Sequence, residues 1–135
     1  MSMHIKTEGL DCSITLGAAD NEGWMRARIE AVTPHFRGDF SCTIEIMEFK
    51  YLIKSLEQLE QSPGKNVEVT WSNMEANIEL KFTQDHIGRL SGEYRLNPHA
   101  FDSGHGSELS GNFCADQTFI PIWLKQAKQV LSNAS

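Results

Sequence analysis

The sequence carries none of the short motifs that mark common enzymes and metal sites. It has no nucleophile elbow, no phosphate-binding loop, no dinucleotide fingerprint and no paired-cysteine metal motif. It also has no run of about 18 apolar residues, the length that a membrane-spanning helix requires, and its first ten residues lack the apolar segment of a secretory signal. These absences predict a soluble, cytoplasmic protein that is not an enzyme and needs no cofactor.

Cysteine and basic residues are both scarce. The three cysteines, Cys12, Cys42 and Cys114, are odd in number and far apart, so we expect reduced structural thiols rather than a disulfide framework. Twelve Lys and Arg stand against eighteen Asp and Glu, which gives a formal charge of -6. No basic cluster is longer than Arg26 and Arg28, and binding to nucleic acid depends on basic residues that neutralise phosphates. A basic protein partner therefore fits the charge better than nucleic acid does.

Alternation of apolar and polar residues is the main pattern that the sequence does contain. In the segment from Leu10 to Leu16, for example, every second residue is apolar. A period of two is typical of antiparallel strands, because only one face of such a sheet meets the core. The pattern predicts strands near residues 9–17, 23–32, 37–46, 66–72, 75–83, 86–96 and 108–115.

Two segments instead have the spacing of amphipathic helices, with apolar residues three and four apart. The first helix is expected near residues 47–62, and the second follows Asp116 or Thr118, either of which can cap it. We find no internal repeat or linker. The order of elements predicts one α+β domain over residues 1–135, with its core at about 10–131. In it, two helices pack on one face of a mostly antiparallel sheet of about six to seven strands.

One loop near residues 97–107 contains the densest set of potential metal ligands. Imidazole and carboxylate groups three residues apart could converge on a divalent ion. The spacing matches no standard zinc motif, however, and a glycine-rich loop is a poor cage. We therefore expect a solvated connection between strands and no bound metal. The weak candidate ligands are His99, Asp102, His105 and Glu108.

Two other pairs of residues have side chains that could take part in catalysis. Asp85 adjoins His86, but neighbours on a strand face opposite ways, so a turn is the simpler interpretation. Cys42 and His35 could form a thiolate and its base, but the alternation points the Cys42 thiol inward. Neither pair is expected to be catalytic.

The three tryptophans fall into two groups. Trp24 is in phase with Arg26 and Arg28, and an exposed tryptophan beside arginines has the composition of an interface hot spot. In the alternative placement, the intervening apolar residues face outward and the arginine stems cover Trp24. The sequence leaves both placements open. Trp71 and Trp123 are in phase with aliphatic neighbours, so we expect them in the core.

Acidic residues are frequent on the first predicted helix and on the hairpin that follows it. They could form one surface for a basic partner, although solvated faces of this kind are also common in soluble domains. We take as candidate partner-binding residues Trp24, Arg26, Arg28, Glu57, Glu60, Glu68 and Glu79.

The order of these parts resembles a known protein family. A tryptophan strand begins with Gly23 and Trp24, and a later strand leads directly into a helix at Glu48 and Phe49. An Asp-His-Ile-Gly turn follows, and an Asp-Gln-Thr segment precedes the last amphipathic helix. This arrangement, over about residues 10 to 131, is similar to the WapI-type immunity proteins and related small bacterial domains. Its motifs are packing and turn signals rather than chemistry.

The resemblance implies a small, non-enzymatic, cytoplasmic bacterial protein. Such a protein binds and neutralises the toxic C-terminal domain of a polymorphic toxin, which is often a nuclease. The resemblance transfers no binding residues, because these proteins vary most where they meet their toxins. Two other interpretations of the chain stay open. One is a scaffold or regulatory subunit that self-associates, and the other is a domain that binds a small molecule or a metal.

Overall fold

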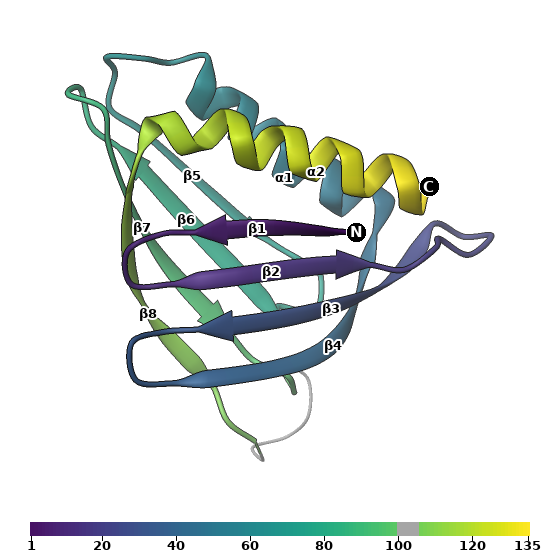
Figure 1. The fold of residues 1–135 in the computed structure, drawn as a ribbon. Coiled ribbons are helices and arrows are strands. Elements are labelled where there is room, and N and C mark those ends of the chain that lie inside the picture. Colours follow the sequence, from purple (N-terminus) through teal and green to yellow (C-terminus); the bar gives the residue numbers. More distant parts are fainter. Residues whose placement is uncertain (100–105) are drawn as a thin grey trace.

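A computed structural model describes residues 1–99 and 106–135, in which eight strands and two α-helices form an α+β fold (Figure 1). A short 3-10 turn, η1 (Gln117–Phe119), precedes the second helix. The elements in chain order are β1 (Ser2–Lys6), β2 (Asp11–Leu16), β3 (Trp24–Val32), β4 (Arg37–Glu45), α1 (Ile46–Glu60), β5 (Val67–Ser72), β6 (Ile78–Gln84), β7 (Arg89–Leu96), β8 (Leu109–Asp116) and α2 (Ile120–Ala134).

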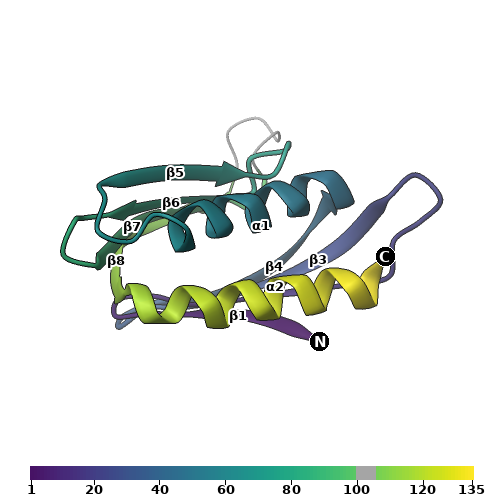
Figure 2. The same ribbon diagram turned by 90° about the horizontal axis from the view of Figure 1, so that it is seen from above.

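The strands form two four-stranded antiparallel sheets. The first sheet has the order β1-β2-β3-β4 and the second the order β5-β6-β7-β8, so each strand pairs with its neighbours in sequence. Figures 1 and 2 show α2 beside β1 and α1 beside β5, along the side of the molecule where these two edge strands run. The two helices also pack against each other, so together they close this side of the space between the sheets.

The expectation of one sheet of six to seven strands is wrong. The sheet is interrupted where α1 follows β4 directly, since the helix carries the chain across to a second sheet. Alternation identifies strands but does not say which of them pair. The expectation that both helices pack on one sheet face is also corrected, because α1 contacts β4 and β5 whereas α2 contacts β1 and β2.

Strand β1 is the element that the sequence interpretation missed. It holds only two core residues, Met3 and Ile5, which alternate with Ser2, His4 and Lys6, and this alternation is too short to stand out. Both core side chains are nevertheless 0% exposed. Tertiary packing rather than local pattern defines this strand, because its inward side chains lie beneath α2, which contacts β1.

The alternating apolar residues of both sheets and the stripes of both helices form one core. Phe82 of β6 is fully buried in this core, and its ring centroid lies 5.7 Å from that of Phe113 of β8 and 6.0 Å from that of Trp123 of α2. The prediction that Trp71 and Trp123 are core residues is confirmed, since both are buried. Strands and helices contribute to the same cluster. One face of each sheet therefore points into the core, and the opposite face points outward.

The two sheets are also tied by main-chain hydrogen bonds away from the helices. Glu8, in the turn between β1 and β2, donates its N–H to Cys114 O of β8 at 3.0 Å. Cys114 returns the bond to Glu8 O at 2.9 Å. Across residues 1–99 and 106–135, neither helix combines the length and apolarity that a membrane span would need.

Candidate functional site

Strand β3 places Trp24 on the outer face of the first sheet. Met25 and Ile29 are fully buried, whereas Arg26 and Arg28 are exposed. Because successive residues of a strand point to opposite faces, Trp24 shares the outer face with the two arginines. The alternative in which the intervening apolar residues face outward is therefore wrong. The Trp24 side chain is half-buried on that face.

Charges on this face are mixed rather than uniformly basic. Arg28 Nη2 lies 3.0 Å from Asp39 Oδ1 on β4, and both side chains are about half exposed. Trp24 stands opposite Glu45 in the β3–β4 register. The arginines therefore do not form a basic patch, and the outer end of the strand, at Trp24, is next to an acidic residue.

The acidic residues of the second sheet are held in an ion-pair ladder. Lys81 Nζ lies 3.5 Å from Glu68 and 3.8 Å from Glu93, while Arg95 lies 3.3 Å from Glu79. Arg95 also donates to Glu108 Oε1 at 2.8 Å, and this hydrogen bond is the main cause that raises the pKa of Arg95. On the first helix, Glu57 pairs with Lys128 at 3.8 Å. Glu68, Glu79 and Glu57 thus have cationic neighbours and do not form an uncompensated acidic surface.

The structure does not bring the predicted binding residues together on one surface. Trp24, Arg26 and Arg28 lie on the outer face of the first sheet, whereas Glu68 and Glu79 lie on the outer face of the second. Glu57 and Glu60 belong to α1, which lies between the two sheets. If these residues bind partners, they do so from three separate surfaces.

Only part of the predicted metal set falls on described residues. Asp102 and His105 lie outside the described residues, and Glu108 is bonded to Arg95. Within the described part of the chain, no three His, Cys, Asp or Glu side chains gather at distances suited to a metal ion. The expectation of no bound metal stays a prediction.

In the two candidate catalytic pairs, Asp85 has a structural role in a turn, and the surroundings of Cys42 keep its thiol protonated. Asp85 Oδ1 accepts the N–H groups of Ile87 at 3.0 Å and Arg89 at 2.9 Å, which confirms the turn interpretation. Burial raises the pKa of Cys42 to about 12, and the negative charges of Glu75 and Glu48 add to this effect. The Cys42 thiol is therefore protonated at neutral pH, which disfavours a role as a nucleophile.

Three segments that are far apart in the sequence meet beside the start of α1. Asp20 Oδ1, in the turn after β2, accepts the N–H groups of Glu22 at 2.9 Å and Trp24 at 3.0 Å. Ile46 N, the first residue of α1, donates to Gly23 O at 2.9 Å. The turn between β2 and β3 is therefore anchored to the N-terminus of the helix.

Glu48 connects the third segment, which is the turn between β5 and β6, to the start of α1. One carboxylate oxygen accepts the N–H of Glu45 at 2.7 Å and completes a capping box. The other oxygen accepts the N–H of Met74 in the turn between β5 and β6, and Glu75 follows directly. One side chain thus caps α1 and holds a turn of the second sheet against it.

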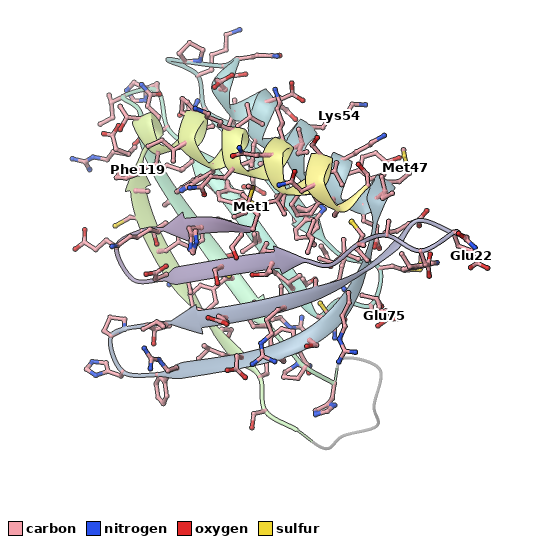
Figure 3. All side chains as sticks on the ribbon, turned by 45° about the vertical axis from the view of Figure 1, so that its right-hand side comes forward. Met1, Glu22, Met47, Lys54, Glu75 and Phe119 are labelled. Carbon is pink, nitrogen blue, oxygen red and sulfur yellow. The ribbon has the colours of Figure 1, made fainter. Side chains whose placement is uncertain are left out.

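We call the resulting surface the acidic end. Figure 3 shows Glu22, Met47 and Glu75 toward the same side of the molecule. Met47 is 49% exposed and Met74 66% exposed, so apolar side chains lie among the charges. In the described part of the chain, none of its carboxylates has an ion pair, unlike those of the ladder on the second sheet. The acidic end consists of Asp20, Glu22, Trp24, Glu45, Met47, Glu48, Met74 and Glu75.

Sequence reasoning identified Trp24 and the acidic residues of the first helix and the following hairpin, but it did not show that Asp20 and Glu22 lie beside them. Asp20 and Glu22 lie in an Asp-Asn-Glu-Gly turn whose composition says only that the chain reverses there. Nothing local indicates that this turn meets residues 73–77 across the start of a helix. The one available signal is Glu45 with Glu48, whose spacing of three residues fits a helix start.

Comparisons with known proteins give a family match and two structural likenesses. The sequence matches the family model described as the immunity protein WapI-like family over residues 3–134. No curated protein matches the sequence significantly. The structure of the plant transcriptional regulator PBF-2 is similar with a TM-score of 0.50 and 5% identity, covering 99% of this chain and 81% of that one. The crystal structure of WHY3 from Arabidopsis thaliana gives 0.48 and 8%, covering 99% and 88%. At 5% identity, the likeness to PBF-2 concerns the fold alone.

Proposed function

The chain belongs to the WapI-like immunity protein family, and from this premise we propose that it binds a toxin domain and neutralises it by occlusion. A protein of this kind works through binding and needs no catalytic group or cofactor of its own. We propose that it acts in the bacterial cytoplasm. The observation that carries the proposal is the family match over residues 3–134, which spans both sheets and both helices.

The charge of the chain supports a basic partner. The formal charge is -6, and the acidic end gathers five carboxylates without ion pairs in the described residues. Opposite charge accelerates the encounter between two proteins and orients it. Toxin domains that act on nucleic acid tend to be basic, so they suit this surface.

The acidic end also offers the apolar contact that a tight complex needs. Binding energy at protein interfaces is concentrated in a few aromatic and apolar residues that lose their water, with charged residues around them. Trp24, Met47 and Met74 fit the central role, because they lie among the carboxylates and keep exposed surface. We therefore propose the acidic end as the part of the surface that meets the toxin first.

The proposal is tested by co-expressing the tagged chain with the polypeptides encoded beside it, followed by purification and mass spectrometry. We expect a basic partner in stoichiometric amount, whose toxicity to the host disappears when the chain is co-expressed. The control variants should neutralise either the acidic end or the ladder of the second sheet: Glu22→Gln with Glu75→Gln, compared with Glu68→Gln with Glu79→Gln. Recovery of the chain alone, with no relief of toxicity by any neighbour, would show the proposal to be wrong.

A further inference from the structure

Three of the four sheet edges are each covered at one or more places along the strand. At the β1 edge, α2 packs alongside and Gln126 Oε1 accepts the N–H of His4 at 2.8 Å. At the β5 edge, α1 packs alongside, and Trp71 Nε1 donates to Glu48 O at 2.8 Å. At the β8 edge, Cys114 exchanges two main-chain bonds with Glu8. Unpaired strand edges readily recruit another chain, and natural proteins cover them for this reason.

The β4 edge is covered only in its second half. Thr43 O accepts a hydrogen bond from Asn73 Nδ2 at 3.3 Å, and the N–H of Glu45 donates to Glu48. These two main-chain groups of β4 therefore point away from β3. Main-chain groups alternate in direction along a strand, so those of Asp39 and Ser41 also point away from β3. No hydrogen bond within the described residues reaches them. Among residues 1–99 and 106–135, the first half of β4 is thus an open edge.

A hydrogen bond on the β2 side of β3 supports this assignment of main-chain directions in β4. Gly17 N donates to Arg26 O at 2.8 Å on the β2 side, which leaves the odd-numbered residues of β3 to pair with β4. In the register, Ala27 stands opposite Cys42 and Ile29 opposite Phe40. The even-numbered residues of β4 therefore bond to β3, and the odd-numbered ones face the open edge.

A groove lies directly beside this open edge. It has a volume of about 660 Å³ and runs between the first half of β4 and the start of β8. Its lining is largely apolar, and Phe36 at its lip is 67% exposed. A strand added to β4 would point every second side chain into such a groove. The apolar side chains that line it are Ala31, Phe36, Phe40, Leu96, Pro98 and Leu109.

The charge at the far end of β4 selects the sign of the partner. Glu75 lines a smaller hollow of about 280 Å³ with Ser41, Cys42 and Thr43, and Arg26 lines the same hollow. Glu45, at the end of the strand, and Glu75 both belong to the acidic end, so the open edge leads into that surface without a break. A strand along β4 would therefore meet apolar groups first and then the carboxylates of Glu45 and Glu75, which outnumber the single cation Arg26 and so favour a basic residue at that point.

We propose that residues 37–42 of β4 accept an extended strand of the toxin partner, which continues the first sheet. Alternate apolar side chains of that strand enter the groove beside Phe40 and Leu109, and a Lys or Arg of the strand faces Glu75. This inference rests on the proposed function, since it names the segment through which the same partner is held. Strand addition gives affinity through main-chain bonds and specificity through the side-chain groove.

Amide hydrogen exchange on the purified complex tests the inference directly. The probe is the toxin domain that co-purifies with the chain, and the free chain is the reference. We expect exchange at the Asp39 and Ser41 amides to slow by at least about tenfold in the complex. The His4 amide, which already donates to Gln126, serves as the internal control and should change little.

A proline substitution removes one of the proposed bonds without removing a bond to β3. Ser41→Pro deletes the outward N–H and fills its place, whereas Ser41→Thr keeps the N–H at the same position. We expect Ser41→Pro to weaken toxin binding by about tenfold or more and Ser41→Thr to change it by less than about threefold. If Ser41→Pro does not fold, Phe36→Asp tests the groove instead. Ile87→Asp is its matched control, because Ile87 is 64% exposed on another turn.

The outcomes separate the two proposals. A toxin that binds and is neutralised without slower exchange at Asp39 and Ser41, and with unchanged affinity in both test variants, overturns the strand addition and leaves the proposed function standing. If no toxin binds, both proposals are wrong. Slow exchange in the free chain that depends on its concentration would assign the edge to a second copy. A small molecule that co-purifies in the groove would assign the groove to a ligand, and either result overturns the inference.

Discussion

Trp24 differs from the other tryptophans in the face on which its strand places it. Trp71 and Trp123 are buried, whereas Trp24 is half-buried among the carboxylates of the acidic end. We expect Trp24→Ala to weaken toxin binding by about 2 kcal/mol or more, because a large aromatic side chain would lose its contact at the interface. Isothermal titration calorimetry with the purified toxin domain measures the effect.

The control for this prediction is the melting temperature of the free chain. Trp24→Ala should lower it only slightly, whereas Trp71→Ala should lower it strongly, since a cavity in the core costs about 3 to 5 kcal/mol. A large loss of stability in Trp24→Ala with unchanged affinity would instead make Trp24 a packing residue and contradict the prediction.

The buried thiols predict how stability changes at high pH. Burial raises the pKa of Cys12 and of Cys42 from 9.0 to about 12. Between these values the unfolded chain has lost protons that the folded chain still binds, so stability falls as pH rises from about 9 towards 12. Each thiol contributes at most about 1.4 kcal/mol per pH unit to this fall. Urea denaturation at several pH values measures the slope.

Two cysteine variants check the cause of this pH dependence. Cys12→Ala should reduce the slope, because it removes one of the groups with a raised pKa. Cys42→Ala should reduce it for the same reason. An equal slope in wild type and Cys12→Ala would assign the pH dependence to other groups.

At the scale of elements, one side chain joins the start of α1 to the turn between β5 and β6. Glu48 accepts the N–H groups of Glu45 and Met74, so its removal leaves two donors without their partners. We expect Glu48→Ala to lower the free energy of unfolding by about 2 kcal/mol, and Glu48→Gln by less, because the amide keeps one acceptor oxygen. Denaturant unfolding followed by circular dichroism measures both.

The matched control lies on the same helix. Glu57→Ala breaks an exposed ion pair to Lys128, so it should cost less than about 0.5 kcal/mol. If Glu57→Ala proves as costly as Glu48→Ala, loss of a surface charge rather than loss of the cap would explain both results.

A strand or helix was predictable from the sequence where the spacing of its apolar residues alone indicated its type. The strands with long alternation, such as β3 and β7, and the helix stripe of α1 all lie where the pattern predicts them. Asp116 caps the 3-10 turn that leads into α2, because its Oδ1 accepts the N–H of Thr118 at 2.9 Å. Strand β1 and the division into two sheets were missed, since both depend on contacts with distant segments.

The candidate site was less predictable than the elements. Alternation put Trp24 in phase with Arg26 and Arg28 but left open which face of β3 points outward, and the buried Met25 decides it. The pairing of Glu68 with Lys81 depends on the β5–β6 register, which fixes which charges are neighbours. The sequence gives the number of charged residues, but only the structure shows which of them form ion pairs.

At the scale of the whole molecule, the distribution of charge predicts a salt-dependent association rate. Raising the ionic strength from about 0.05 to 0.5 M should slow toxin association by roughly tenfold, because salt screens charges over a few ångströms at the higher concentration. Dissociation should change much less. Stopped-flow fluorescence of Trp24 or a labelled toxin measures both rates.

Variants that replace glutamate by glutamine identify which charges accelerate association. Glu22→Gln with Glu75→Gln should slow association and weaken its salt dependence, whereas Glu68→Gln with Glu79→Gln should change it less, since these residues already face Lys81 and Arg95. An association rate insensitive to salt would contradict electrostatic steering by the acidic end.

The strands and helices of the described residues share one core, and we propose that residues 1–135 fold as one domain. Both sheets and both helices contribute to a single cluster of buried side chains. The cluster also includes Met3 near the start of the described chain and Ala134 near its end. Such a domain should unfold in one cooperative transition.

The packing of α2 on β1 has a consequence for how the protein is made. The bond from His4 to Gln126 joins residues 122 positions apart, so β1 leaves the ribosome long before its cover exists. At the usual rates of synthesis this delay lasts roughly 6 to 24 s. During translation, the first sheet therefore presents an unprotected edge to chaperones and to neighbouring nascent chains. On the proposed function, the chain could bind its toxin only after its own last helix has emerged.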